Sequence, residues 1–189
     1  MSAVTRNRIY MKDVMVDIET LSTRPNAVIV SIGAIKFDRV GMTPALDDMN
    51  SFYTRVSKES CEVLGMHVDP DTLAWWKKQD ADIRYEALEN PMDRLTIHDA
   101  LKSLSEWFGR SQFIWGHGDD FDCVVLSEAF KTCNIKVPWQ FWNTRDTRTL
   151  FDIAGIRNSD LPANDKHHPI HDCYRQFIGV KKAFSKLNI

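Results

Sequence analysis

Two carboxylates one residue apart, Asp17 and Glu19, lie near the end of an apolar stretch in the sequence VMVDIETLS. Side chains alternate between the two faces of a β-strand, so these acids would share one face, and Val14, Val16 and Ile18 the other. Two acids on one face repel each other and are costly to desolvate unless a positive charge lies between them. The pair therefore indicates a divalent metal site, with a solvated strand end as the alternative.

A third acid, Asp122, lies just inside a predicted helix that follows a short strand, in the sequence GHGDDFDCVVL. Asp119 and Asp120 are nearer the start of that helix, where acids interact favourably with the helix dipole. That interpretation fits Asp122 less well, because Asp122 follows Phe121 and precedes an apolar run. Of these three acids, Asp122 is therefore the candidate for the metal site.

A histidine and an acid stand five residues apart where the last predicted helix begins, in the sequence KHHPIHDC. This spacing can leave Asp172 on the helix while His167 reaches over the same site from the preceding loop. One such spacing is not specific, and a surface histidine near a helix start is the alternative for His167.

The order of the predicted elements indicates an α/β fold with a mixed central sheet flanked by helices. Three apolar strands come first, and their short connections predict an antiparallel meander. The strands are expected at about residues 13–18, 28–38 and 51–56, with a further short strand within 113–118. Helices are expected from Asp69-Pro70 onward and at about residues 97–108, 120–133, 145–155 and 169–186. Gly33, inside the second strand, predicts a bulge or a close approach of another backbone.

In this order the acids and the histidine resemble the DEDDh family of 3′–5′ exonucleases, which has a ribonuclease-H-like fold. The pattern is D-x-E on a first strand, an Asp about a hundred residues later, and H-x-x-x-x-D at a late helix. Position by position, Asp17 and Glu19 match the first motif, Asp122 the second and Asp172 the third. His167 matches the general base.

Two positions refine the resemblance. The related tyrosine subclass has Tyr four residues before the last Asp, where this chain has His168, so the histidine subclass fits better. The second motif reads Gly-His-Gly instead of the more usual Gly-Asn-Gly, and His117 is not expected to be a ligand. The segments TLAWWKKQDADIR, FWNTRDTRT and HHPIHDC look like those of phage exodeoxyribonucleases of the T-even type and of small bacterial exoribonucleases.

The resemblance implies a chemistry for the four acids. They would hold two Mg²⁺ or Mn²⁺ ions, hard cations that take carboxylate and water oxygens. In such a site one ion activates the attacking water and the other stabilises the leaving 3′-oxygen. His167 would accept the proton of the water, since an imidazole with an ordinary pKa of about 6.5 is neutral at pH 7. The product would be a nucleoside 5′-monophosphate.

Seven further residues are candidates for contacts with the nucleic acid. Leu21, which follows the metal-binding pair, matches an apolar wedge against the terminal bases, with a place in the core as the alternative. Two adjacent tryptophans on a helix point about 100° apart, so one is expected in the core while the other stacks on a base. The polar candidates could bind phosphate or pair with nearby acids. The seven candidates are Thr20, Leu21, Trp75, Trp76, Gln79, Phe121 and Arg145.

The composition sets the class of the protein. The chain has 189 residues, of which 43% are hydrophobic and 26% charged, as in an ordinary globular domain. Four scattered cysteines without a C-x-x-C pair argue against a zinc ribbon or disulfide framework, and favour the cytoplasm, or the host cytoplasm for a phage protein. No apolar run is long enough to span a bilayer, so no membrane partner is expected. Residues 1–12 are expected to be a tail and residues 13–189 a single exonuclease domain.

Together these features predict a metal-dependent 3′–5′ exonuclease that acts on the 3′ ends of single-stranded nucleic acid, with DNA preferred over RNA. The first alternative is an exoribonuclease or a phosphodiesterase that clears short oligonucleotides, since a net charge of −2 fits a small footprint on the substrate. A noncatalytic nucleic-acid-binding subunit is the alternative from another class. Most of the six Trp and ten Phe are expected in the core. An exposed subset could form a homodimer surface.

Overall fold

A six-stranded mixed sheet forms the centre of the molecule. The computed structural model describes residues 11–118, 120–163 and 167–189, and the strand order is β4-β3-β2-β1-β5-β6. The first three strands pair antiparallel, as predicted, whereas β1–β5, β5–β6 and β3–β4 are parallel pairs. The strands are β1 (Asp13–Thr20), β2 (Ile29–Phe37), β3 (Asn50–Val56), β4 (Arg94–Leu95), β5 (Phe113–Gly116) and β6 (Thr144–Asp146). Most of the expected tail lies outside the described residues, so the division at residue 12 stays a prediction.

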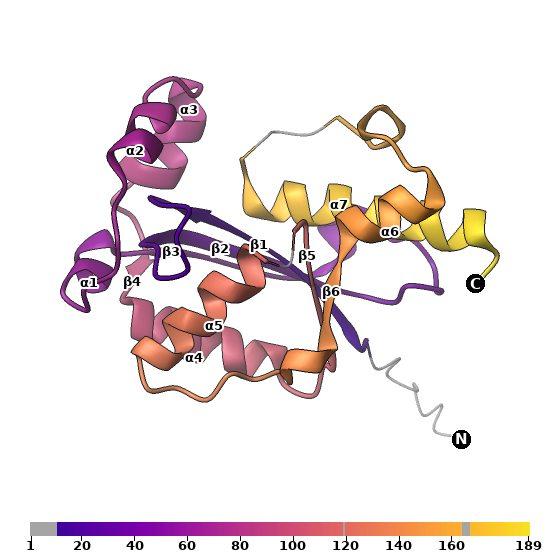
Figure 1. Ribbon diagram of the computed structural model, residues 1–189, viewed down its shortest axis with the longest axis horizontal. Coiled ribbons are helices and arrows are strands. Elements are labelled where there is room, and N and C mark those ends of the chain that lie inside the picture. The colour runs from indigo at the N-terminus through magenta and orange to yellow at the C-terminus, as the bar shows by residue number, and fades with distance from the viewer. Residues whose placement is uncertain (1–10, 119, 164–166) are drawn as a thin grey trace, which may run out of the picture.

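Helices cover both faces of this sheet (Figure 1). α4 and α5 lie on one face, and α6 and α7 on the other. α2 and α3 lie beyond the C-terminal end of β1. The helices are α1 (Lys58–Glu62), α2 (Pro70–Trp76), α3 (Ala81–Arg84) with a π-helical turn at Tyr85–Glu89, α4 (Ile97–Phe108), α5 (Asp122–Thr132), α6 (Thr147–Ala154) and α7 (Pro169–Leu187). Short 3₁₀ turns occur at Leu46–Asp48, Phe141–Asn143 and Asn158–Asp160. Within the described ranges no helix is long and apolar enough to cross a membrane.

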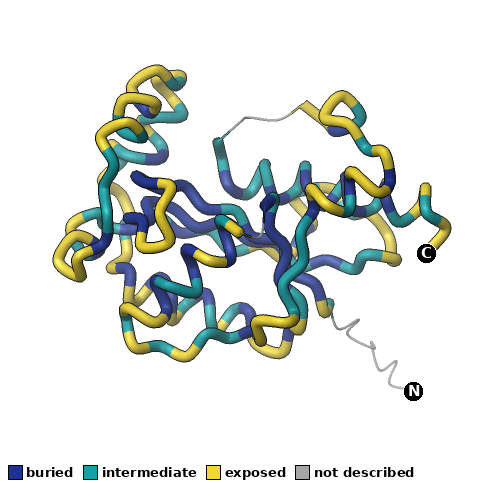
Figure 2. Tube along the Cα trace, viewed as in Figure 1, coloured by how far each residue is buried: buried dark blue, intermediate teal, exposed yellow. Residues whose placement is uncertain are grey.

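The alternation of β1 side chains divides the interior into two cores, and the sheet between them is buried along most of its length (Figure 2). Val14, Val16 and Ile18 belong to the larger core under α4 and α5. Met15 belongs to the smaller core under α7, where it lies with Phe177. The same alternation places the odd-numbered acids of β1 on the face that α7 covers.

Gly33 explains how closely α7 approaches the sheet. A Cβ atom at this position would lie 2.5 Å from Pro169 Cβ and 2.9 Å from the Ile170 nitrogen. Gly33 pairs with Asp17 in the antiparallel register, so the missing side chain lets the start of α7 sit beside this acid. The close approach predicted at Gly33 is confirmed.

The start of α2 is confirmed as well, whereas the start of α6 differs from the prediction. Asp69 caps α2 by accepting the Thr72 backbone N–H at 3.2 Å. The helix predicted at residues 145–155 begins at Thr147 instead, because Asp146 ends β6 and caps α6 through the Thr149 N–H at 3.0 Å. The helix that begins at Pro70 ends at Trp76.

Candidate metal centre and nucleic-acid cleft

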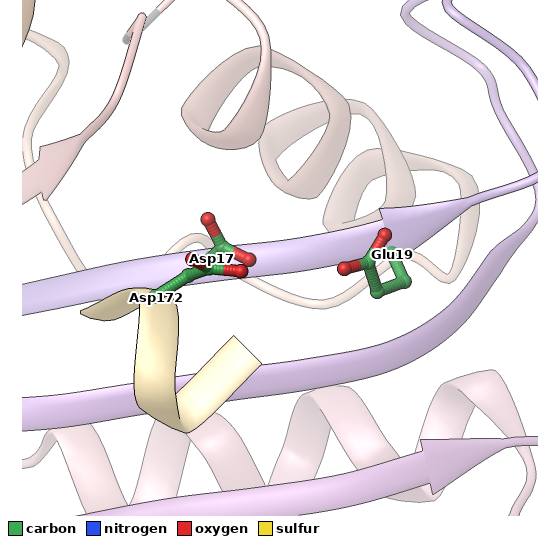
Figure 3. A group of neighbouring side chains, drawn as sticks. All are labelled: Asp17, Glu19 and Asp172. Carbon is green, nitrogen blue, oxygen red and sulfur yellow. The ribbon is translucent and has the colours of Figure 1, made fainter. Parts of the chain in front are cut away.

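β1 and α7 together bring three acids into one cluster (Figure 3). Asp17 and Glu19 lie on the same face of β1, and Asp172 lies in the first turn of α7. One carboxylate oxygen from each lies within 4.8 Å of the others. The shared face predicted for the β1 pair is thereby confirmed, and the late-helix acid meets it there.

Asp122 reaches the cluster from the opposite side of β1. It is the first residue of α5 and is buried, and its Oδ1 accepts a hydrogen bond from the Ile18 backbone N–H at 3.2 Å. Its charge helps to raise the pKa values of Asp17 and Glu19, which places it within electrostatic reach of both. All four predicted acids therefore converge around one end of β1.

Burial and like charge make this cluster costly to ionise. Burial, followed by the charges of the neighbouring acids, raises the pKa of Asp17 well above its ordinary value, and the same causes raise the pKa of Glu19. Burial also raises the pKa of Asp122 to about 7, although backbone hydrogen bonds from Ile18 and His117 act in the opposite direction. An added cation would relieve this repulsion.

His167 is tied to the cluster through its backbone. Its residue adopts a left-handed conformation, with φ of 63°, and its N–H donates to Asp172 Oδ2 at 2.9 Å. This conformation is uncommon for a residue other than glycine, so the turn into α7 is held by specific contacts. The imidazole packs edge to face against Trp75, with ring centroids 5.0 Å apart. The five residues of the DEDDh pattern thus lie in one region of the molecule.

A cleft of about 440 Å³ opens beside Glu19. Trp75, which is 41% exposed, and Phe121 supply its aromatic surface, and Thr20 lines it as well. The remaining lining residues are Ile18, Thr23, Asp69, Asp71 and Thr72. An aromatic cleft next to a carboxylate cluster can hold a base while its phosphate faces the acids.

Four of the seven sequence-derived contact candidates do not line this cleft. Leu21 is only 2% exposed and belongs to the larger core, the alternative already considered for it, because its N–H pairs with the Val28 carbonyl and turns the side chain inward. Trp76 is 1% exposed and donates from Nε1 to the Thr20 carbonyl at 2.9 Å. It is therefore the core member of the tryptophan pair.

The polar candidates are also engaged elsewhere. Gln79, three residues past the end of α2, donates to the Trp75 carbonyl at 3.1 Å. Arg145, on β6, donates to the carbonyls of Trp142 and Thr144, and its guanidinium lies over the Phe113 ring. Arg145 is directed to the edge of the sheet and does not line the cleft.

Two polar residues near the acids were not among the seven contact candidates predicted from the sequence. Arg148 lies against Gly118, and its charge lowers the pKa of Asp122, so it is the arginine that faces the site. Gln176 donates to Asp17 Oδ1 at 3.0 Å and carries no sequence motif. Its spacing of four residues from Asp172, one turn of α7, was the signal available in the sequence.

Comparisons with known proteins agree with this geometry. The model of a family described as the 3′–5′ exoribonuclease Rv2179c-like domain matches residues 12–183. The exodeoxyribonuclease of Enterobacteria phage T4 is 22% identical over 206 residues, which cover 92% of this chain and 89% of the phage protein.

Solved structures show the same fold. The zinc-bound complex of E. coli exonuclease I with single-stranded DNA aligns with a TM-score of 0.63 and 12% identity, over 93% of this chain and 41% of that one. S. pombe Pop2p in its Mg²⁺- and Mn²⁺-bound form aligns with a TM-score of 0.56 and 12% identity, over 93% and 83% of the two chains. This chain thus spans about two fifths of exonuclease I, and the predicted ribonuclease-H-like fold is confirmed.

Proposed function

Because the chain belongs to the family of 3′–5′ exoribonuclease Rv2179c-like domains, and is a 3′–5′ exonuclease, we propose that it removes nucleotides from single-stranded nucleic acid with two divalent cations. The products would be nucleoside 5′-monophosphates. The observation that carries this proposal is the cluster in which oxygens of Asp17, Glu19 and Asp172 lie within 4.8 Å of one another.

The donor set of the cluster fits Mg²⁺ or Mn²⁺. All candidate ligands are carboxylates, which hard cations of this kind prefer. Among the described residues, no Lys or Arg forms an ion pair with Asp17 or Glu19. Asp17, Glu19, Asp122 and Asp172 would hold the ions. Bound there, two cations supply an activated water and stabilise the oxygen that leaves.

His167 is the proposed general base. Its imidazole accepts a proton from the attacking water, and its backbone bond to Asp172 keeps it beside the acids. Trp75 packs against the ring and limits its motion. Replacing His167 with Ala should lower the rate by about 10²- to 10⁴-fold, the usual contribution of a positioned base. Mn²⁺ affinity, measured by calorimetry, should stay unchanged; a parallel loss of affinity would contradict the proposed role.

The cleft is the proposed site of the terminal nucleotide. Trp75 and Phe121 can stack on its base, a contact worth about 1–3 kcal/mol per base and tolerant of sequence. Thr20 offers a hydroxyl near the sugar, although that hydroxyl already donates to the Ser22 carbonyl at 2.7 Å. The substrate is therefore expected to be single-stranded, since stacking on these side chains requires an unpaired base.

DNA is the proposed preferred substrate, and RNA is the second candidate. The phage relative that is similar over 92% of this chain is an exodeoxyribonuclease, which supports DNA. The description of the matching family as exoribonuclease supports RNA. The 2′-hydroxyl that distinguishes the two sugars would be read by a few contacts in the cleft.

The test uses 5′-labelled single-stranded DNA and RNA of one sequence, side by side, with Mg²⁺, with Mn²⁺ and with EDTA. We expect a metal-dependent ladder that shortens from the 3′ end, with DNA cleaved faster, and no ladder from the Asp17→Asn variant. Faster cleavage of RNA would reverse the proposed preference. A length series from dinucleotides upward would identify an oligonucleotide-clearing enzyme by a maximum at the shortest substrates. No cleavage with either metal would contradict the proposal and would favour the alternative, a noncatalytic nucleic-acid-binding subunit.

Location and oligomeric state are separate proposals. Cytoplasmic location rests on the scattered cysteines alone. For a homodimer, Phe141 and Trp142 are the exposed aromatic pair, with ring centroids 4.8 Å apart. Light scattering of the wild type and of a variant with both residues changed to Ser would report the mass directly.

A further inference from the structure

Gln176 lies directly behind the acid cluster. It follows Asp172 by four residues on α7, so the two side chains emerge on the same face of the helix, one turn apart. The residue is only 5% exposed. A neutral amide so deeply buried must find hydrogen-bond partners, or it costs stability.

Only one of the two polar atoms of the Gln176 side-chain amide has a hydrogen-bond partner among the described residues. Nε2 donates to Asp17 Oδ1 at 3.0 Å. Oε1 is buried and has no hydrogen-bond partner among the described residues. An unsatisfied buried acceptor lowers stability, and a ligand that donates a hydrogen bond to it would recover the loss. Because Nε2 donates to the Asp17 carboxylate, Oε1 is the amide atom that is left to accept a hydrogen bond from a ligand.

Two other buried polar atoms without partners in the described parts of the chain lie on the same side of the sheet as Gln176 Oε1. These side-chain atoms are Ser31 Oγ and His168 Nδ1. Ser31 is the cross-strand partner of Glu19, and the His168 ring stacks on Tyr53 two strands from β1. Because Tyr53 pairs with Gly33, the cross-strand partner of Asp17, all three orphaned atoms lie on the sheet face that carries the acids.

We propose that Gln176 is a positioning residue of the metal site. Its Nε2 fixes the Asp17 carboxylate through Oδ1 and leaves Oδ2 for an ion, and its Oε1 accepts a hydrogen bond from water of the ion's hydration shell. Outer-shell partners of this kind orient the ligands, and their loss typically costs about 10- to 100-fold in metal affinity. The inference rests on the proposed function, since it requires ions at the cluster.

The test replaces Gln176 with Met, which has a similar shape but neither a strong donor nor a carbonyl. Calorimetric titration with Mn²⁺ should show affinity weakened by about 10- to 100-fold. Turnover at low Mn²⁺ should fall in proportion and should recover at saturating Mn²⁺, because the four acids remain. A Gln112→Met variant, at an exposed glutamine before β5, is the control and should match the wild type in both.

A purely structural role predicts a different pattern. In EDTA, Gln176→Met should melt close to the wild type, because the lost hydrogen bond is offset by removal of the orphaned carbonyl. A large loss of metal-free stability with unchanged Mn²⁺ affinity would overturn the inference. If the Met variant does not fold, Gln176→Asn, which keeps the amide but shortens its reach, is judged by the same criteria.

The wild type separates the two claims. If it binds Mn²⁺ and cleaves nucleic acid while Gln176→Met binds equally well, the role of Gln176 is wrong and the proposed function stands. If the wild type binds no divalent cation, the proposed function fails first, and the role of Gln176 fails with it.

Discussion

The acids at the two ends of β1 differ in whether a positively charged side chain lies beside them. Asp13, at the start of the strand, is 4% exposed and forms an ion pair with Arg39, whose Nε donates at 3.0 Å. Trp115 Nε1 donates to the same carboxylate at 2.8 Å. Asp17 and Glu19 lie on the same face a few residues on, and among the described residues no lysine or arginine pairs with either.

This difference separates an acid that stabilises the fold from the acids that, in the proposed function, hold the metal ions. At the start of β1, the Arg39 guanidinium neutralises Asp13 and stabilises the fold. At the other end the chain gathers like charges whose pKa values burial and mutual repulsion raise. Such a cluster lowers stability on its own, which is the reason for proposing that it binds a cation from solution.

The largest expected effect is on catalysis at the unpaired end. Changing Asp17 to Asn keeps the shape of the side chain and removes one ligand charge, so kcat should fall by on the order of 10³-fold or more. Metal-free stability should stay equal or rise, because one like charge is gone. Single-turnover cleavage and urea unfolding in EDTA measure the two effects, and a rate close to wild type would refute the ligand role of Asp17.

The opposite pattern is expected at the paired end. Changing Asp13 to Ala leaves Arg39 and the Trp115 N–H without their acceptor and should lower the free energy of unfolding by about 3 kcal/mol. Cleavage per folded molecule at 25 °C should be unchanged, because the acid cluster is intact. Urea unfolding is the measurement; an Asp13→Ala variant that is stable but inactive would reverse the comparison.

Divalent metal should stabilise the folded protein by binding at Asp17 and Glu19 and not at Asp13. Mn²⁺ at 100 times its dissociation constant should raise the free energy of unfolding by about 2.7 kcal/mol if it binds only the folded state. The increase should be preserved in Asp13→Ala and reduced in Asp17→Asn. Thermal melts across a Mn²⁺ series give this directly, and equal shifts in both variants would place the ion elsewhere.

The smallest effect, counted per pH unit, is a pH dependence of the metal-free protein. Burial raises the pKa of Asp122 from 3.8 to about 7, so between these values the folded state holds a proton that the unfolded state releases. Stability should therefore fall as pH rises from about 4 to 7, by up to about 1.4 kcal/mol per pH unit for this group. Asp122→Asn should show a shallower fall in urea unfolding at several pH values. An identical slope in both proteins would contradict the raised pKa.

Strand alternation and helix signals predicted much of this site from the sequence. The shared face of Asp17 and Glu19 follows from a period of two, and the start of α2 follows from Asp69-Pro70. The split between the two tryptophans follows from helix geometry. Which tryptophan is buried did not follow, because it depends on the contact of Trp76 with the Thr20 carbonyl.

Residues placed by tertiary contacts were the ones that sequence reasoning misplaced or missed. Leu21 turns into the core because a loop hydrogen bond fixes its backbone, and Arg145 is held by carbonyls at the sheet edge. Neither contact has a local sequence signal. Gln176 is uncharged, so a search for acids and histidines passes over it, although it lies one turn from Asp172.

The most direct test of the central claim is anomalous diffraction from crystals soaked in Mn²⁺. We predict two anomalous peaks among the carboxylates of Asp17, Glu19, Asp122 and Asp172, and none beside Asp13 at the other end of β1. Loss of at least one peak is expected in Asp17→Asn. Crystals that diffract well but show no peak at the four acids, at Mn²⁺ concentrations that support cleavage, would contradict the account.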